Sequence, residues 1–115
     1  THEQLQARVE SLLKELQIDY ELRWKVAGKP FLTKRGALTT AIQRAVKEHT
    51  GLDPEMSTSG GTSDGRFIAP YGIDVVELGP INESIHKVNE IVSIEDLERL
   101  ERIYFRIAEL LLVGD

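Results

Sequence analysis

The sequence contains no cysteine, which excludes disulfide bonds, thiolate metal sites and a cysteine nucleophile. Long apolar runs are also missing, since the longest covers residues 110–113 and a bilayer-spanning helix needs about 20. No charged-then-apolar segment of the signal-peptide kind opens the chain. We therefore expect a cytoplasmic protein without a membrane partner.

Basic residues are outnumbered, with 14 Lys and Arg against 19 Asp and Glu and a net charge of −5. A surface that neutralises many phosphates is not expected from this balance, so we expect no nucleic-acid partner, with a local basic patch as the open alternative. Methionine is nearly absent: Met56 is the only one, and Thr1 stands where an initiator would be expected. We expect these 115 residues to be part of a longer protein.

The start of the chain predicts a helix followed by a strand. Thr1 and Gln4 have the spacing of a capping box, and a helix is expected over residues 1–17. Its apolar positions fall on one face: Leu5, Val9, Leu12, Leu13 and Leu16. Over residues 18–26, apolar and charged residues then alternate strictly. This period is typical of a half-buried strand.

Two further helices and a second strand are predicted downstream. Residues 36–49 have helical apolar spacing and end before Gly51, a typical helix-ending residue. Residues 73–78 are mostly apolar and β-branched, which favours a strand buried on both faces, as in α/β sheets. Ser93 and Asp96 form a second capping box before a long amphipathic helix. Residues 27–30, with a glycine and a proline, are the expected domain junction.

The loop of residues 57–66, STSGGTSDGR, is the richest local motif. Gly61 can expose backbone N–H groups to a ligand, Thr62 adds a hydroxyl group, and the guanidinium of Arg66 suits a carboxylate. The lysine that a phosphate-binding loop needs after its second glycine is missing. On composition alone, an ordinary glycine-rich surface turn explains this segment equally well.

His86 follows the second predicted strand, where α/β folds often bind ligands. A catalytic zinc ion is held by about three protein ligands, and no second histidine or carboxylate lies near His86 at a recognised metal spacing. From the residues alone, a surface histidine is the better interpretation. Asn82, four positions earlier, likewise has the spacing of ordinary turn chemistry.

Three segments together resemble the C-terminal third of bacterial succinyl-diaminopimelate desuccinylases, in the same order and spacing. They are GKPFLT at 28–33, STSGGTSDGRFIA at 57–69 and VVELGPINESIHKVNE at 75–90. The resemblance implies an α/β fold, in which residues 29–115 are the C-terminal segment of a zinc-hydrolase catalytic domain. Residues 1–28 would be the last helix and strand of an α+β lid and dimerisation domain, in a homodimeric enzyme.

The resemblance also implies roles for individual residues. His86 would be the terminal ligand of one of two zinc ions, with cobalt as an alternative metal, and Arg66 would hold a substrate carboxylate. The other expected substrate contacts are Gly61, Thr62 and Asn82. These enzymes often have serine where this chain has Ala27, so a hydroxyl contact to a substrate carboxylate there is either lost or made by the backbone. No catalytic residue of the group, such as its general base, can be matched in this chain.

The implied reaction is zinc-dependent hydrolysis of a linear amide, N-succinyl-LL-2,6-diaminopimelate, to succinate and LL-2,6-diaminopimelate in lysine and diaminopimelate biosynthesis. Because one histidine cannot hold two zinc ions, we expect these residues alone to be inactive and to bind zinc weakly. Two alternatives stay open. One is a sister hydrolase of the acetylornithine deacetylase or aminoacylase type, and the other is a non-catalytic module that dimerises through the edge of residues 18–26.

Overall fold

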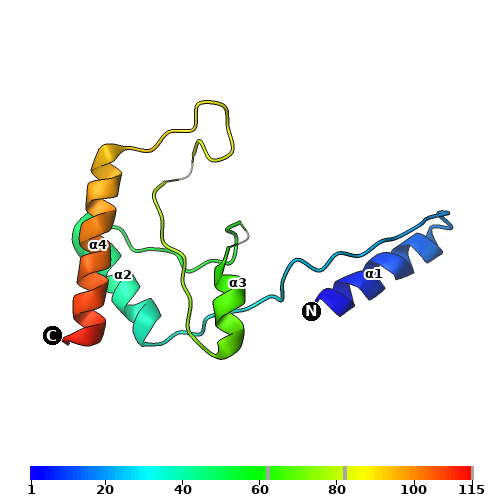
Figure 1. Ribbon diagram of the computed structural model, residues 1–115, viewed down its shortest axis with the longest axis horizontal. Coiled ribbons are helices and arrows are strands. Elements are labelled where there is room, and N and C mark those ends of the chain that lie inside the picture. Colours follow the sequence, from blue (N-terminus) through cyan, green and yellow to red (C-terminus); the bar gives the residue numbers. More distant parts are fainter. Residues whose placement is uncertain (62, 82, 115) are drawn as a thin grey trace. The chain divides into compact units, whose positions relative to one another are not determined.

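A computed structural model describes residues 1–61, 63–81 and 83–114, and its regular elements are helices (Figure 1). They are α1 (His2–Glu15), α2 (Ala37–Thr50), α3 (Gly65–Ile68), the 3-10 helix η1 (Ala69–Tyr71) and α4 (Ile94–Leu112). The chain divides into two compact units, Thr1–Leu32 with Thr62–Ile73 and Thr33–Gly61 with Asp74–Asp115. None of the described helices is both long and apolar enough to cross a membrane.

The three long helices predicted from the sequence are confirmed, and their ends follow local chemistry. At the start of α1, the Gln4 N–H donates to Thr1 Oγ1 at 3.4 Å while the Gln4 side chain accepts from the Thr1 amino group at 2.6 Å. α4 begins where Ser93 Oγ accepts from the Asp96 N–H at 3.3 Å. α2 ends at Gly51, whose φ of 73° is the left-handed conformation that glycine adopts without strain.

The chain reverses its direction after α1 through a Schellman-type ending. The Gln17 N–H donates to the Lys14 carbonyl at 3.1 Å and the Ile18 N–H to the Leu13 carbonyl at 3.0 Å, with Gln17 at a φ of 55°. Residues 18–26 then run back along α1 (Figure 1), and the indole N–H of Trp24 donates to Glu10 Oε1 at 3.2 Å.

The predicted strands are wrong for the residues that the structure describes, and the structure therefore does not support an α/β sheet or a lid strand there. Residues 18–26 keep their alternating pattern, but they have no strand neighbour. Alternation defines the two faces of an extended chain, whereas a strand also requires a second segment to pair with its N–H and C=O groups. The apolar side chains of the pattern are all exposed here: Ile18, Tyr20, Leu22, Trp24 and Val26.

Residues 73–78 are not a strand either, and they are only partly buried rather than covered on both faces. Val76 and Leu78 pack against the core, while Ile73 is exposed. At two points, side chains hydrogen-bond to the backbone of this segment in place of a neighbouring strand. Thr33 Oγ1 hydrogen-bonds to the backbone of Val75, and the Tyr104 hydroxyl donates to the Leu78 carbonyl at 2.5 Å.

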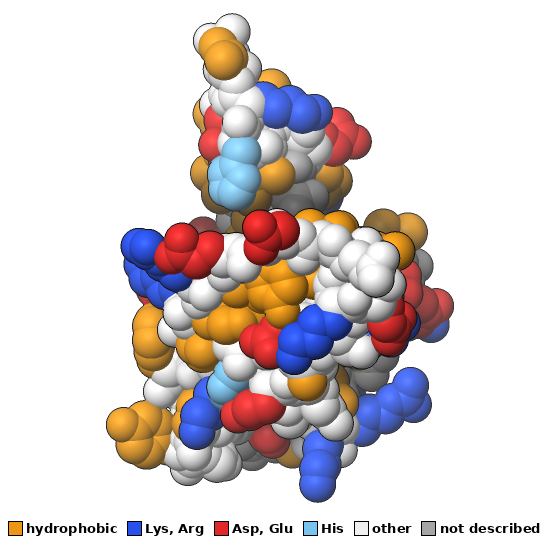
Figure 2. All heavy atoms as spheres, turned by 90° about the vertical axis from the view of Figure 1, so that its right-hand side faces the viewer, with side chains coloured by type: hydrophobic (Ala, Val, Ile, Leu, Met, Phe, Trp, Pro, Cys, Tyr) orange, Lys and Arg blue, Asp and Glu red, His pale blue; other side chains and the backbone are white. Residues whose placement is uncertain are grey.

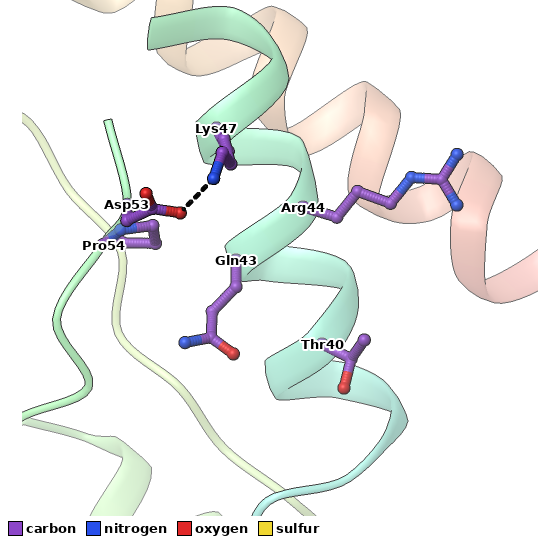
Figure 3. A pocket seen from close by; sticks show the side chains of 6 residues that line it. All are labelled: Thr40, Gln43, Arg44, Lys47, Asp53 and Pro54. Carbon is purple, nitrogen blue, oxygen red and sulfur yellow. Dashed lines mark hydrogen bonds and ion pairs between the residues drawn. The ribbon is translucent and has the colours of Figure 1, made fainter. Parts of the chain in front are cut away.

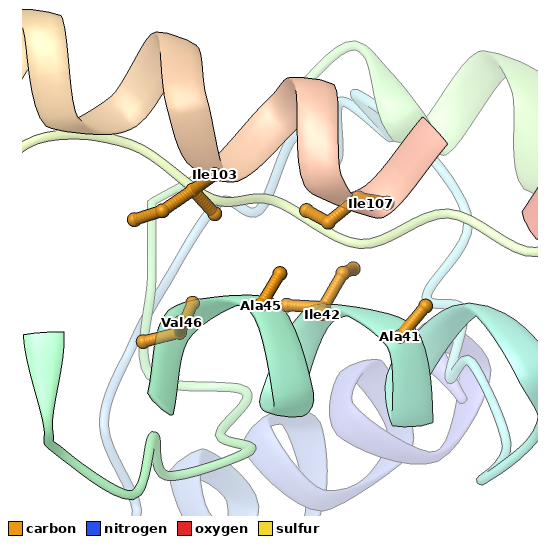
Figure 4. Packing of buried hydrophobic residues seen from close by; sticks show 6 residues of the cluster. All are labelled: Ala41, Ile42, Ala45, Val46, Ile103 and Ile107. Carbon is orange, nitrogen blue, oxygen red and sulfur yellow. The ribbon is translucent and has the colours of Figure 1, made fainter. Parts of the chain in front are cut away.

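The core lies between α2 and α4 (Figure 4). Apolar positions on α2 recur at helical spacing and face two isoleucines of α4, and the buried hydrophobic residues are Ala41, Ile42, Ala45, Val46, Ile103 and Ile107. Many larger hydrophobic side chains remain at the surface among charged ones (Figure 2). α1 contributes no buried residue at all, and its Leu5 is 69% exposed.

An ionic cluster supplements the apolar contact between α2 and α4. Glu48 accepts from Arg106 Nε and from Arg44 Nε, both at 2.8 Å. The hydrogen bond from Arg106, followed by that from Arg44, lowers the pKa of the Glu48 carboxyl from its ordinary 4.5 to about 2. The carboxylate of Glu48 therefore links the two helices at neutral pH.

Candidate functional site

Arg66 is the predicted site residue with the most defined surroundings. It lies in the one-turn helix α3, whose start is fixed by Ser63: Ser63 Oγ accepts from the Gly65 N–H at 3.1 Å, and the Ser63 carbonyl accepts from the Arg66 N–H at 3.4 Å. A serine two residues before a glycine is common turn chemistry. The polar loop thus ends in a turn that holds the backbone of Arg66.

The side chain of Arg66 is half-buried and carries an unused donor. Its guanidinium carbon lies 4.6 Å from the centre of the Phe67 ring, within the range of a cation–π contact. The Nε–H is buried and has no hydrogen-bond acceptor among the described residues. A buried donor without an acceptor is costly, so this group is suited to an added acceptor such as a carboxylate.

The adjacent glycines of the polar loop, Gly60 and Gly61, are open to solvent, whereas Gly65 is buried. Gly61 is exposed, and a side chain placed there would meet nothing within 4 Å. Just before it, Ser57 Oγ accepts from the Ser59 N–H at 3.0 Å, which closes a short turn. Gly61 therefore has the accessible backbone that a substrate contact requires. Thr62 and Asn82, the other two predicted contacts, lie outside the described residues.

The loop that carries His86 is closed by Ser84. Ser84 Oγ donates to the Ile91 carbonyl at 2.8 Å and accepts from the Ile91 N–H at 3.0 Å. Within this loop His86 and Asn89 have left-handed backbone conformations, with φ of 61° and 62°, which are uncommon for residues other than glycine. The imidazole of His86 is exposed, and its backbone N–H donates to Glu90 Oε2 at 3.4 Å.

A zinc site is not completed by this part of the protein. Across the described ranges, no three His, Asp or Glu side chains are grouped so that they could hold one metal ion. A catalytic zinc ion is held by about three protein ligands. A metal ion at His86 would need its other ligands from elsewhere, and the residues present do not fit a two-zinc centre by themselves.

The predicted site residues divide between the two units. Arg66 belongs to the first unit, whereas Gly61 and His86 belong to the second. The two units offer different chemistry. The first provides a guanidinium for an anionic group, and the second provides an accessible backbone and an exposed imidazole.

Two surface hollows were not predicted from the sequence. The first, of about 390 Å³, lies over α2 and is lined by Thr40, Gln43, Arg44, Lys47, Asp53 and Pro54 (Figure 3). Lys47 Nζ is paired with Asp53 at 2.7 Å, so these two charges are already satisfied. The sequence feature that could have indicated this hollow is the helical spacing of the polar positions 40, 43, 44 and 47 on one face of α2. We assign no chemistry to it.

The second hollow, of about 240 Å³, lies between the loop that carries His86 and the start of α4. Its lining residues are Ile81, Glu83, Ser84, Ile91, Val92, Ser93 and Asp96. His86 is not among them. Since Ser84 and Ser93 are both engaged in loop and helix-cap hydrogen bonds, the hollow reflects how the loop joins α4.

Comparison with known proteins defines the class. The peptidase family M20/M25/M40 matches residues 2–110, so the chain belongs to this family. This chain is 60% identical to the succinyl-diaminopimelate desuccinylase of Nitrosococcus oceani over 97% of the 115 residues. It is 56% identical to the enzyme of Thioalkalivibrio sulfidiphilus over 98% of them. The enzyme of Nitrosomonas eutropha is 52% identical over the whole chain.

The chain covers 30% of the length of each of these three relatives. The resemblance first seen in three short segments is therefore confirmed along essentially the whole chain. It places these residues beside one portion of a longer enzyme, and the roles of Gly61, Thr62, Arg66, Asn82 and His86 stay predictions.

Proposed function

We propose that this chain is part of an enzyme that hydrolyses N-succinyl-LL-2,6-diaminopimelate to succinate and LL-2,6-diaminopimelate. The observation that carries the proposal is 60% identity to a succinyl-diaminopimelate desuccinylase across 97% of the chain. This match covers 97% of the chain, so it includes the two segments that hold the predicted site residues, 57–69 and 75–90. The enzyme would act in the cytoplasm, in lysine and diaminopimelate biosynthesis, as a homodimer.

The chain would contribute substrate contacts to that enzyme. Arg66 is proposed to hold a substrate carboxylate, because its buried Nε–H lacks an acceptor and a guanidinium matches a carboxylate in shape and charge. The backbone of Gly61 is proposed to hydrogen-bond to the substrate, which its exposure supports. Thr62 and Asn82 are proposed as further substrate contacts on the strength of the resemblance.

Metal dependence is general in this family. We propose zinc, with His86 as one ligand, in a site that holds two ions. The general base and the remaining ligands would come from another portion of the enzyme. The proposed division between a lid and dimerisation part, residues 1–28, and a catalytic part, residues 29–115, belongs to the same hypothesis.

Substrate selectivity tests the proposal against its nearest alternative. Zinc-loaded full-length enzyme is offered N-succinyl-LL-2,6-diaminopimelate and, separately, N-acetylornithine, and release of the free amine is followed. The proposal predicts a clear preference in kcat/KM for the succinylated compound. Preference for N-acetylornithine would instead assign a sister hydrolase. Hydrolysis of neither compound by a folded, metal-loaded protein would favour the non-catalytic module.

A further inference from the structure

Gly28 lies directly against the side chain of Arg66, although the two residues are far apart in the sequence. A Cβ atom built at Gly28 would be 2.7 Å from Arg66 Cδ, and 3.5 Å from both Cγ and Nε. Two carbon atoms are at their optimal separation at about 3.5–4.0 Å, so the first of these distances is a collision. Both residues belong to the same unit of the structure.

The backbone conformation of Gly28 does not itself call for glycine. The chain has left-handed glycines at Gly51 and Gly72, where a side chain would strain the backbone, but Gly28 is not in that region. Gly36 has an extended backbone and a Cβ there would meet nothing within 4 Å. What distinguishes Gly28 is the space that its missing side chain leaves for Arg66.

The side chain of Arg66 is thereby held between two neighbours. Its aliphatic part lies against Gly28, and its guanidinium lies over the Phe67 ring at 4.6 Å. Nε, the atom at the junction of these two parts, is the buried donor without an acceptor. Gly28 and the Phe67 ring together fix the position of the Nε–H donor of Arg66.

We infer that Gly28 is a positioning residue. It fixes the position of the Arg66 guanidinium and hence the ability of this group to bind a substrate carboxylate. The inference rests on the proposed role of Arg66. Because the collision is with the middle of a flexible side chain, alanine at position 28 would displace that side chain rather than the backbone. A displacement of about 1 Å at a substrate-orienting group can lower activity by up to about 100-fold.

The test is a double-mutant cycle in the full-length enzyme with Gly28→Ala, Arg66→Ala and both together. Gly28→Ala is expected to lower kcat/KM by about 10- to 100-fold, and to have no further effect once Arg66 is alanine. Gly36→Ala serves as the matched control, with kcat/KM unchanged. If the two effects simply multiply, or if Gly28→Ala leaves kcat/KM unchanged, Gly28 does not act through Arg66.

Two additional readouts keep the inference separate from folding and from the proposed reaction. If Gly28→Ala lowers Tm, the added Arg66→Ala substitution should restore it, because the collision is then gone; a Tm that stays low contradicts the inference. If the wild-type enzyme hydrolyses no succinylated substrate, the proposed function fails, and crystal structures of wild type and Gly28→Ala decide the positioning. The inference predicts a displaced Arg66 guanidinium, and an unmoved one overturns it.

Discussion

The hydroxyl group of Thr33 hydrogen-bonds to both backbone polar groups of Val75, donating to the carbonyl oxygen and accepting from the N–H at 3.1 Å. One side chain thus takes the place of a neighbouring strand at this point. Replacing Thr33 by valine keeps its shape and removes both hydrogen bonds. We expect the free energy of unfolding to fall by about 1–3 kcal/mol, because two partly buried groups lose their partner.

Denaturant unfolding of the full-length protein measures this change. Thr40→Val is the control, since Thr40 is exposed on α2 and exposed substitutions usually change stability by less than about 0.5 kcal/mol. Equal stability of Thr33→Val and Thr40→Val would show that the two hydrogen bonds contribute nothing.

The contact between α2 and α4 predicts a larger effect at Ile103, which is 4% exposed. Truncation to alanine leaves a cavity beside α2 and should cost about 2–5 kcal/mol. Ile94, at the start of the same helix, is 75% exposed, and its alanine variant should be nearly neutral. Thermal unfolding of both variants compares them directly, and similar Tm values would contradict the packing described here.

Glu48 predicts a defined pH dependence. Its pKa in the folded protein, about 2, lies below its ordinary 4.5, so the stabilisation it provides is complete above about pH 4.5 and is lost as the pH falls toward 2. Glu48→Gln should therefore lower Tm at neutral pH, with the difference from wild type shrinking between pH 4.5 and 2. A Tm difference that stays constant across this range would mean that the Arg106 and Arg44 contacts do not depend on the charge of Glu48.

The sequence predicted the helices far better than the strands, for a physical reason. A helix satisfies its own backbone, so a capping pair such as Ser93 and Asp96 and an apolar stripe are enough to define it. A strand needs a partner from another segment, which local alternation cannot supply. Residues 18–26 therefore keep the right period without forming a sheet.

The site was predictable in part. The loop chemistry of residues 57–66 pointed to Arg66, and the structure adds its contact with Phe67 and its buried donor. The contact between Gly28 and Arg66 could not be predicted in this way. A glycine is needed at position 28 to make room for a side chain distant in the sequence, and not to form a local turn. For His86, residue type alone favoured a surface histidine, and only the resemblance suggested a metal.

Zinc binding by the 115-residue chain alone provides another prediction. Since no group of three possible metal ligands includes His86 in the part of the chain that is described, we expect calorimetric titration to detect only weak binding. His86→Ala should reduce even that. Tight binding of two zinc ions by the isolated chain would contradict the ligand assignment.

The most direct test of the account measures succinate release from N-succinyl-LL-2,6-diaminopimelate by the zinc-loaded full-length enzyme with His86→Ala. His49→Ala, at an exposed position in the last turn of α2, is the matched control. Loss of residues that merely support a metal ligand costs about 10- to 100-fold, so loss of the ligand itself should reduce activity by at least about 100-fold. The account predicts this loss for His86→Ala and wild-type activity for His49→Ala. Full activity of His86→Ala would contradict the proposed place of this chain in a zinc-dependent active site.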